Sequence, residues 1–306
     1  MVFLTLFLGL ILLIIGAESI IRGSVSLAKQ LNVSLFAIGV VVVGAGTSLP
    51  ELANCVRTVV MNHPDIAVGA VVGSNIANII LIMGATALLC PVESVTREQV
   101  NQTFINIFIA LAFIVFSFLS LVFNFLFGFI ALILLTLIMT FQMKSKKVNL
   151  SDVQDQKSYS LLITIFLIIF GIILLIFGSR YFIQSAIEIA QQFNISESII
   201  GVSLVAFGTS LPELVVGIFS AFKRRVDFAL GNVLGSNIYN VLGILGISSF
   251  FGTFSIPEIL ASYDIYVMLV TVLFISFFIL LLKKLNRVFG LISITGYIYY
   301  IYSLYI

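Results

Sequence analysis

Two glutamates stand in the middle of long apolar stretches, each at the end of the same six-residue motif. Residues 46–51 and 208–213 both read Gly-Thr-Ser-Leu-Pro-Glu and end at Glu51 and Glu213. An ionised carboxylate in the apolar interior of a membrane costs about 2.5–3.5 kcal/mol on insertion scales unless another group offsets its charge. Neither motif contains a Lys or Arg. We therefore expect a cation from solution to supply the compensating charge. The alternative is a protonated carboxyl that only holds helices together.

The same motif supplies oxygen atoms other than the carboxylate. Pro50 and Pro212 have no N–H, so a helical carbonyl one turn earlier loses its donor. We expect both helices to kink or unwind there, and unwound backbone in transporters presents carbonyl oxygens to ions. A proline kink stabilised by nearby hydroxyls is the structural alternative. The hydroxyls on the turn before each carboxylate belong to Thr47, Ser48, Thr209 and Ser210.

A second motif, Gly-Ser-Asn-Ile-x-Asn, follows on the next apolar stretch at residues 73–78 and 235–240. Its Ser and its last Asn are four residues apart, so they share one helix face. Small-residue packing with interhelical hydrogen bonds would explain this motif if it stood alone. Beside two buried carboxylates, we interpret its polar side chains as cation ligands. These are Ser74, Asn78, Ser236 and Asn240.

The remaining residues of the second motif are expected to position the others. Gly73 and Gly235 should permit close approach of neighbouring helices, while Asn75 and Asn237 should cap or orient. Oxygen ligands without Cys or His clusters select hard cations. Two carboxylates are neutralised by one Ca²⁺, which takes six to eight oxygens, and several Na⁺ could occupy the same oxygens. Competition between two such cations for one set of ligands is sufficient for antiport.

These residues must be positioned by membrane-spanning helices. Of the 306 residues, 61% are hydrophobic and 9% are charged, which excludes a water-soluble globule. The apolar runs have the length of transmembrane helices, and residues 108–129 lack the alternation of a membrane β-barrel. The net charge of +2 and the absence of a basic cluster argue against nucleic acid as a partner, and Cys55 and Cys90 lack metal-ligand spacing. No charged residue precedes the first run, so we expect it to be retained as a span.

The chain is an internal duplication. Thr209 follows Thr47 by 162 residues, and the same offset relates both motifs, without a gap, from about residue 9 to residue 84. We expect five spans in each half. Because five is odd, the second half enters the membrane in the opposite sense, as inverted-topology repeats. The expected spans are 1–22, 33–60, 66–90, 103–122, 125–142, 160–181, 195–222, 228–252, 265–282 and 288–305.

Basic residues predict the orientation of these spans. With the N-terminus outside, thirteen of the fifteen Lys and Arg residues fall at cytoplasmic span ends, and only Arg57 and Arg180 do not. The expected organisation is a first five-helix repeat at 1–142, a polar cytoplasmic linker at 143–158 and a second repeat at 159–306. The linker is too short for a regulatory calcium domain. Glu18 and its repeat equivalent, Arg180, are expected to be interfacial, with gating as the alternative.

The paired motifs resemble the two α-repeats of the cation/calcium exchanger superfamily, specifically those of prokaryotic sodium/calcium exchangers. The similarity covers nearly the whole chain. It implies an all-α polytopic membrane protein of ten transmembrane helices in two inverted five-helix repeats, with the N-terminus outside. It also implies electrogenic exchange of extracellular Na⁺ for intracellular Ca²⁺, in which the first and sixth spans slide past a fixed core.

The resemblance also implies a role for individual residues. Glu51 and Glu213 would be the central Ca²⁺ ligands, shared with Na⁺. The position of Asn240 is Asp in potassium-dependent members, so Asn in both repeats implies potassium independence. The implied carbonyl ligands are Thr47, Thr209, Gly44 and Ala206, the implied hydroxyl ligands are Ser48, Ser210, Ser74 and Ser236, and Asn78 and Asn240 would line the middle of the site.

Other functions stay open as alternatives. A Ca²⁺/H⁺ antiporter could use Glu51 and Glu213 as its proton carriers, although the Gly-Asn-Ala that typically precedes the glutamate in that branch is absent. A cation channel and a non-transporting membrane scaffold are less favoured. The expected setting is a multi-pass protein of a prokaryotic plasma membrane, with Ca²⁺ and Na⁺ as substrates, the lipid bilayer as partner, and no cofactor, nucleic acid, obligatory protein partner or enzymatic activity.

Overall fold

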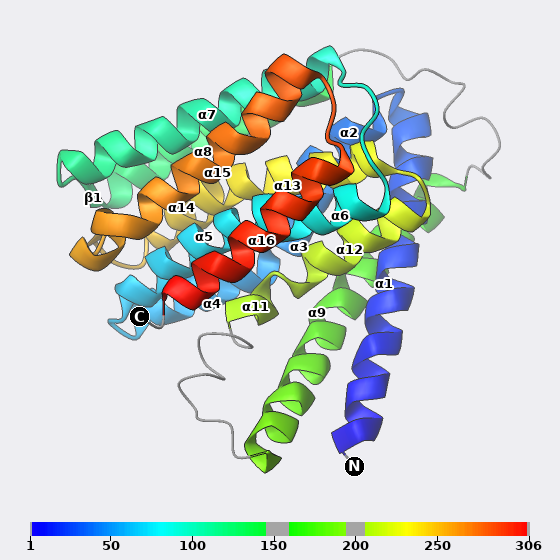
Figure 1. Ribbon diagram of the computed structural model, residues 1–306, viewed down its shortest axis with the longest axis horizontal. Coiled ribbons are helices and arrows are strands. Elements are labelled where there is room, and N and C mark those ends of the chain that lie inside the picture. The colour runs from blue at the N-terminus through cyan, green and yellow to red at the C-terminus, as the bar shows by residue number, and fades with distance from the viewer. Residues whose placement is uncertain (1, 145–158, 194–205, 305–306) are drawn as a thin grey trace.

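The computed structural model describes residues 2–144, 159–193 and 206–304, and nearly all of them are helical (Figure 1). Within these ranges, seven helices are long and apolar enough to cross a membrane, or eight if the bent pair Leu35–Thr47 and Leu49–Val60 forms one span. The chain is therefore an all-α polytopic membrane protein. Two short strands, β1 (Val122–Phe123) and β2 (Phe254–Ser255), pair antiparallel, and Val92 bridges Leu285.

The two longest helices lie side by side and extend together away from the rest of the bundle (Figure 1). They are α1 (Val2–Leu31) and α9 (Leu161–Gln192). A Cβ atom on Gly9 would lie 2.9 Å from the carbonyl oxygen of Gly178, and one on Gly16 would lie 2.9 Å from that of Gly171. The backbones therefore touch, because no side chain separates them at these points.

Both helices run further than their expected spans. The sequence boundaries at residues 22 and 181 mark where polar residues begin, yet α1 continues to Leu31 and α9 to Gln192. A helix does not end where its surroundings become polar, because its backbone hydrogen bonds are satisfied internally. Gly23 lies within α1 without ending it, no Pro follows residue 22 in this helix, and α1 ends at the turn at Asn32, which has a left-handed φ of 54°.

The middle of the bundle is built from two similar successions of short helices, with η denoting a π-helical turn. The first comprises α2 (Leu35–Ile38), η1 (Gly39–Val43), α3 (Gly44–Thr47), α4 (Leu49–Val60), α5 (Pro64–Ala77), η2 (Asn78–Met83) and α6 (Gly84–Leu89). The second comprises α11 (Ala206–Thr209), α12 (Leu211–Phe222), α13 (Val226–Ile238), η5 (Tyr239–Ile244) and α14 (Leu245–Ser248). α13 packs against η1, α3 and α12, so it is central.

Equivalent turns join the long helices of these two successions. The turn after α4 places Asn62 at a φ of 59°, and the turn after α12 places Arg224, 162 residues later, at 56°. His63 N donates to Thr58 O at 2.8 Å, as Arg225 N donates to Ser220 O at 2.7 Å. The duplicated sequence therefore forms the same local structure twice, even though one turn is neutral and the other basic.

The outer helices cover this middle layer. They are α7 (Arg97–Phe118), α8 (Phe125–Lys144), η6 (Leu260–Asp264), α15 (Ile265–Phe277), η7 (Phe278–Leu282) and α16 (Arg287–Ser303). Thr96 begins α7 with a reciprocal capping box to Gln99. When the bent pair counts as one span, two of the ten expected spans are not among the eight long apolar helices of the described chain. One contains α12, which follows the undescribed residues 194–205, and the other is α16, with 17 residues.

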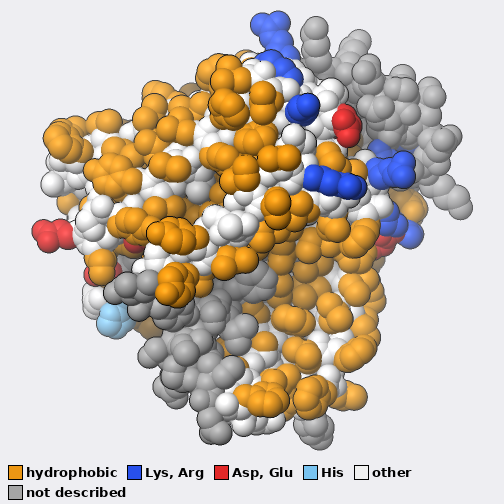
Figure 2. Space-filling view, viewed as in Figure 1, with side chains coloured by type: hydrophobic (Ala, Val, Ile, Leu, Met, Phe, Trp, Pro, Cys, Tyr) orange, Lys and Arg blue, Asp and Glu red, His pale blue; other side chains and the backbone are white. Residues whose placement is uncertain are grey.

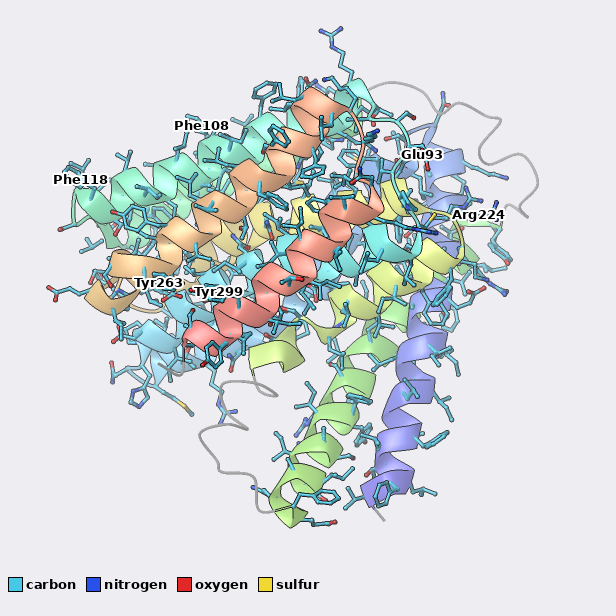
Figure 3. The ribbon with its side chains drawn as sticks, viewed as in Figure 1. Glu93, Phe108, Phe118, Arg224, Tyr263 and Tyr299 are labelled. Atoms are coloured by element: carbon cyan, nitrogen blue, oxygen red, sulfur yellow. The ribbon has the colours of Figure 1, made fainter. Side chains whose placement is uncertain are left out.

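The surface is that of a protein embedded in lipid. Hydrophobic side chains cover most of the face shown in Figure 2, and the Lys and Arg side chains gather at its upper right. Phe108 and Phe118 on α7 point away from the bundle and are largely exposed (Figure 3). Arg224 lies at the basic end and Tyr299 lies on the apolar flank (Figure 3). An apolar belt of this kind is typical of helices that face hydrocarbon.

Candidate functional site

Both motif glutamates lie where a helix is broken. α3 ends at Thr47 and α4 begins at Leu49, and the axes of the pair are bent by 42°, which confirms the kink predicted from Pro50. In the second half, α11 ends at Thr209 and α12 begins at Leu211, while the residues before Ala206 lie outside the described chain. Glu51 and Glu213 therefore stand in the first turn of α4 and α12, where the helix N-terminus favours negative charge.

Both carboxylates are buried, with 2% of Glu51 and 1% of Glu213 exposed. The two are near enough to interact electrostatically, and Glu213 lies beside the side chains of Thr47 and Ser48. No Lys or Arg is among the described groups that act on either carboxylate. Two buried negative charges that face each other without a basic partner require either protons or a cation.

Four asparagines form a reciprocal hydrogen-bond network beside the glutamates. Asn78 Nδ2 donates to Asn237 Oδ1 at 2.9 Å, and Asn240 Nδ2 donates to Asn75 Oδ1 at 2.9 Å. Asn75 and Asn237 also donate to each other's backbone carbonyl at 3.4 Å. Each bond has a counterpart 162 residues away. Asn75 thus orients Asn240, and Asn237 orients Asn78, which is the orienting role predicted for Asn75 and Asn237.

This arrangement leaves acceptor atoms without donors at the centre of the protein. Among the described residues, Glu51 Oε2, Glu213 Oε2, Asn78 Oδ1 and Asn240 Oδ1 have no hydrogen-bond partner. Buried polar atoms are almost always satisfied, so orphaned groups call for an explanation. All four are oxygens, in two repeat-equivalent pairs, and carboxylate and amide oxygens are the donors that Ca²⁺ and Na⁺ prefer. The residues present fit a hard cation.

The hydroxyl and carbonyl candidates join the two halves. Ser210 Oγ donates to Ser74 Oγ at 3.2 Å, and Ser236 Oγ lies 3.5 Å from Gly44 O. Gly44 has no room for a side chain, because a Cβ would lie 2.9 Å from Ser236 N. Ser48 is buried and its side chain lies beside the carboxylate of Glu213. The carbonyl of Gly44 is therefore held against the second motif by direct backbone contact.

The remaining candidates are placed less closely together. Thr209 shares a cavity with Ser74, and Ala206 is the first residue of α11. Of the two motif glycines, Gly235 permits close approach, since a Cβ there would lie 2.5 Å from Val40 O. The expectation for Gly73 was wrong, because nothing lies within 4 Å of a Cβ there and the residue faces the cavity.

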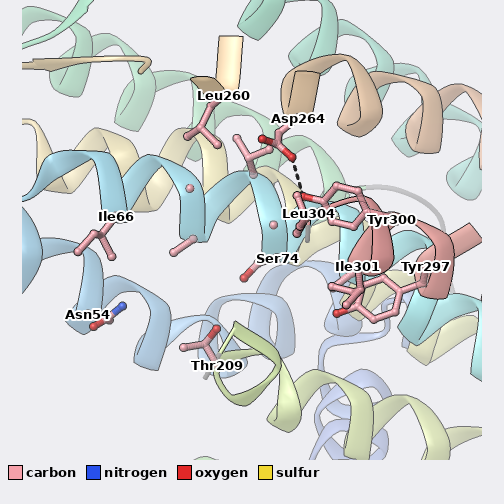
Figure 4. A pocket seen from close by; sticks show the side chains of 15 residues that line it. Asn54, Ile66, Ser74, Thr209, Leu260, Asp264, Tyr297, Tyr300, Ile301 and Leu304 are labelled. Carbon is pink, nitrogen blue, oxygen red and sulfur yellow. Dashed lines mark hydrogen bonds between the residues drawn. The ribbon is translucent and has the colours of Figure 1, made fainter. Parts of the chain in front are cut away.

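That cavity has a volume of about 370 Å³ and reaches from the surface to the candidate ligands (Figure 4). Ile66 and Leu304 at its rim are exposed, whereas Ser74 is buried. The walls come from α4, α5, α11, η6 and α16. A cavity with an exposed rim and candidate ligands in its wall is a route by which an ion could approach.

Asn232 is a polar residue of the site that the motif search did not single out. It is fully buried on α13 and accepts a 3.2 Å hydrogen bond from Thr47 Oγ1 through Oδ1. Ala70 is its repeat equivalent, so the search for duplicated polar residues passed over it. Helical spacing could have found it, because Asn232, Ser236 and Asn240 recur every fourth residue and so line one face.

The π-helical turns were also not predicted. η2 begins at Asn78 and η5 begins one residue before Asn240. A π-turn inserts an extra residue into the helix, leaves backbone groups without their usual partner and is frequent at functional sites. Both turns therefore occur directly at the asparagines of the second motif.

Several known proteins are similar to this chain in sequence and in overall fold. The sequence profile described as "Sodium/calcium exchanger protein" matches residues 1–144 and 163–306. The sodium/calcium exchanger MaX1 of Methanosarcina acetivorans is 32% identical over 99% of this chain and 98% of that protein. The membrane protein MJ0091 of Methanocaldococcus jannaschii is 33% identical over 97% of this chain and 96% of its own length. The solved structure of the sodium–calcium exchanger NCX_Mj soaked with zero Na⁺ and Ca²⁺ is similar with a TM-score of 0.86, at 32% identity over 99% of this chain and all of that one.

Proposed function

Because this chain belongs to the sodium/calcium exchanger family, and is therefore a transporter and not an enzyme, we propose that it exchanges Na⁺ for Ca²⁺ by alternating access. The observation that carries the proposal is the set of orphaned oxygens on Glu51, Glu213, Asn78 and Asn240. One Ca²⁺ would neutralise both carboxylates. Several Na⁺ would do the same, so the two substrates exclude each other at one place.

The proposed ligand set is that expected from the sequence. The two carboxylates are the shared ligands, and the amide oxygens of Asn78 and Asn240 complete the middle of the site. The absence of a carboxylate at Asn240 supports potassium-independent exchange. The remaining ligands are the hydroxyls of Ser48, Ser74, Ser210 and Ser236 and the carbonyls of Gly44, Thr47, Ala206 and Thr209.

We further propose ten spans in two inverted repeats, with residues 143–158 as a cytoplasmic linker in a prokaryotic plasma membrane. α12 with the residues before it and α16 would complete the count of ten. The backbone contacts of Gly9 with Gly178 and of Gly16 with Gly171 support movement of α1 and α9 as one unit, because small residues let the two helices pack closely. Exchange of more than two Na⁺ per Ca²⁺ would make the cycle electrogenic.

The deciding experiment measures ⁴⁵Ca²⁺ uptake into proteoliposomes preloaded with Na⁺. Vesicles preloaded with choline, and vesicles with a pH gradient and no Na⁺ gradient, are the matched controls. Uptake that requires internal Na⁺ supports the proposal. Uptake driven by the pH gradient alone would overturn it in favour of Ca²⁺/H⁺ antiport by Glu51 and Glu213, and downhill flux without a counter-ion would indicate a channel.

A further inference from the structure

The cavity lined by Ser74 and Thr209, which the proposed orientation places on the external side, contains a buried carboxylate that the proposed exchange site does not use. Asp264, at the junction of η6 and α15, is 7% exposed and lines the cavity wall (Figure 4). It is the single charged side chain among the described lining residues. A carboxylate in such a place costs free energy unless its charge is compensated.

Asp264 has a hydrogen-bond donor on one oxygen and none on the other. Tyr300 Oη, itself only 8% exposed, donates to Asp264 Oδ1 at 2.8 Å, as the dashed line in Figure 4 shows. In the described part of the chain, Oδ2 has neither a hydrogen bond nor a basic partner. Tyr300 thus fixes the carboxylate while leaving one oxygen available.

The surroundings favour a cation as the missing partner. The other polar side chains of the described wall carry oxygen, in the amide of Asn54, the hydroxyls of Ser74 and Thr209 and the phenols of Tyr297 and Tyr300. At about 370 Å³, the cavity has room for a hydrated ion, since one water occupies about 30 Å³. Hard cations bind such oxygens while retaining part of their water shell.

We propose that Asp264, held by Tyr300, forms a second cation site in this cavity, which receives a divalent cation before it reaches Glu51 and Glu213. The cavity wall contains both Asp264 and Ser74, so a captured ion lies in the same cavity as one of the proposed ligands of the exchange site. The capture role rests on the proposed exchange function, whereas binding at Asp264 does not. Gln102 stands 162 residues before Asp264, so the opposite face of the protein lacks the charge at this position.

Tyrosine-sensitised Tb³⁺ luminescence tests binding at Asp264 directly. Tb³⁺ replaces Ca²⁺ at oxygen sites, and the chain has ten Tyr and no Trp, so excitation near Asp264 must come from tyrosine. The measurement is made on the Glu51→Gln/Glu213→Gln double variant, in which the midplane site has lost both charges. We expect Ca²⁺-displaceable emission to persist there and to fall at least fivefold when Asp264→Asn is added.

Two matched variants separate binding from packing. Asn at position 264 keeps an oxygen to accept from Tyr300, so it removes the charge while preserving the hydrogen bond. Glu258→Gln removes an exposed carboxylate six residues earlier and should leave the emission unchanged. Emission that survives Asp264→Asn, or that Glu258→Gln reduces equally, would overturn the proposed site.

Transport from each side tests the capture role. In right-side-out vesicles, Asp264→Asn should raise the external KM for Ca²⁺ three- to tenfold without changing the maximal rate. In everted vesicles the KM should stay unchanged. If Asp264→Asn left the external KM for Ca²⁺ at the wild-type value, or raised the KM by the same factor on both sides, the capture role would be overturned. Failure of the exchange function is seen separately, as wild-type Ca²⁺ uptake that does not require Na⁺ on the opposite side.

Discussion

At the scale of single residues, the site is defined by what its oxygens lack. Asn75 and Asn237 accept hydrogen bonds from the amide donors of Asn240 and Asn78, and the amide oxygens of Asn240 and Asn78 are buried without a partner in the described chain. In a pocket lined only by neutral groups, water molecules would donate hydrogen bonds to such amide oxygens. Four orphaned oxygens, two of them on the carboxylates and two on the asparagines, instead define an electronegative centre.

Removing one carboxylate charge should abolish transport. Glu51→Gln or Glu213→Gln keeps the side-chain size but leaves the centre with a single negative charge against a divalent ion. We expect Na⁺-driven ⁴⁵Ca²⁺ uptake to fall to the level of protein-free vesicles. Membrane insertion, measured as yield and monodispersity in detergent, should be unchanged. Normal uptake by either variant would falsify the shared-carboxylate site.

The orienting asparagines should affect affinity more than maximal rate. Asn75→Ala leaves Asn240 Nδ2 without its acceptor, and an unsatisfied buried donor costs about 1–3 kcal/mol. We expect the KM for Ca²⁺ to rise about fivefold or more, since 1.4 kcal/mol is a factor of ten in affinity. Asn124→Ala is the control, because it removes the cap of α8 far from the site. An equal KM change in that control would mean general destabilisation.

The carboxamide at position 240 should set ion selectivity. Asn240→Asp adds a third carboxylate beside Glu51 and Glu213, so a further cation or proton is needed to neutralise the site. We expect uptake that is stimulated by K⁺ or that gains a steeper dependence on pH, whereas wild type shows neither. Uptake assayed over a K⁺ series and a pH series makes the comparison. A variant unchanged in both would place residue 240 outside the ion site.

The repeated polar motifs made most of the site predictable. Glu51, Glu213, Ser74 and Ser210 could be found because duplication marks polar residues that apolar packing does not need. Asn232 could not be found that way, since one half has Ala at the equivalent position. Which oxygen of each asparagine stays free depends on side-chain rotamers and hydrogen-bond partners across the two halves, and the linear sequence contains neither.

At the scale of helices, the pair α1 and α9 differs from the rest of the bundle. Its contact is made by Gly9 with Gly178 and by Gly16 with Gly171, so the helices meet backbone to backbone. The sequence predicted both as spans and placed Gly at equivalent positions. It could not predict their extra length beyond residues 22 and 181, because helix ends are set by turns rather than by hydropathy.

A side chain in the contact between α1 and α9 should impair the pair. Gly16→Ala places a Cβ 2.9 Å from the carbonyl oxygen of Gly171, which is backbone and cannot turn aside. We expect a loss of about 1–3 kcal/mol in stability, as for other overpacked sites, and slower exchange. Gly296→Ala is the control, because nothing lies within 4 Å of its Cβ and Ala favours helix. Thermal unfolding in detergent and ⁴⁵Ca²⁺ uptake measure the two effects. Higher stability in both variants would contradict the close contact.

An ion pair links α1 to the end of α12. Glu18 accepts from Arg22 Nε at 2.7 Å and lies 3.0 Å from Lys223 Nζ. The groups are partly exposed, so the pair contributes no more than about 1 kcal/mol. That is still enough to shift a two-state equilibrium about fivefold if α1 moves relative to α12.

Coupling across this pair can be measured with a double-mutant cycle. Glu18→Gln and Lys223→Gln should each change the exchange rate up to about fivefold, and the double variant should change it no further, because the same contact is lost. The difference should vanish at high ionic strength, since exposed pairs are screened. Additive single effects, or effects that persist in high salt, would show that Glu18 and Lys223 act separately.

At the scale of the whole molecule, the two halves repeat one structure with different surface charge. The turns at Asn62 and Arg224 have the same backbone, yet one is neutral and the other is basic. The all-α membrane fold, the kink at Pro50 and the equivalence of the two turns were predictable, because they follow from hydropathy, proline and sequence duplication. The π-turns and the β1–β2 pair were not, since they arise from packing between segments far apart in sequence.

Labelling from opposite sides tests the inverted repeat. Asn62→Cys and Arg224→Cys are introduced separately into a Cys55→Ser/Cys90→Ser background. The two positions have similar φ angles, 59° and 56°, so a cysteine should strain the backbone to the same extent at both. A membrane-impermeant maleimide should label residue 62 in right-side-out vesicles and residue 224 only in everted ones. Labelling of both from the same side would exclude opposite orientation of the halves.

The hydrogen bond from Thr47 to Asn232 has a consequence for how such a molecule can change over generations. Two identical subunits assembled around a twofold axis must carry the same residue at both equivalent positions. They cannot have asparagine at one of these positions and alanine at the other. Covalent fusion of the copies in one gene removes that requirement, and each half then mutates independently. Position 70 is alanine and position 232 is asparagine in this chain, so its centre combines a symmetric set of oxygens with a hydrogen bond that no homodimer could have on one side alone.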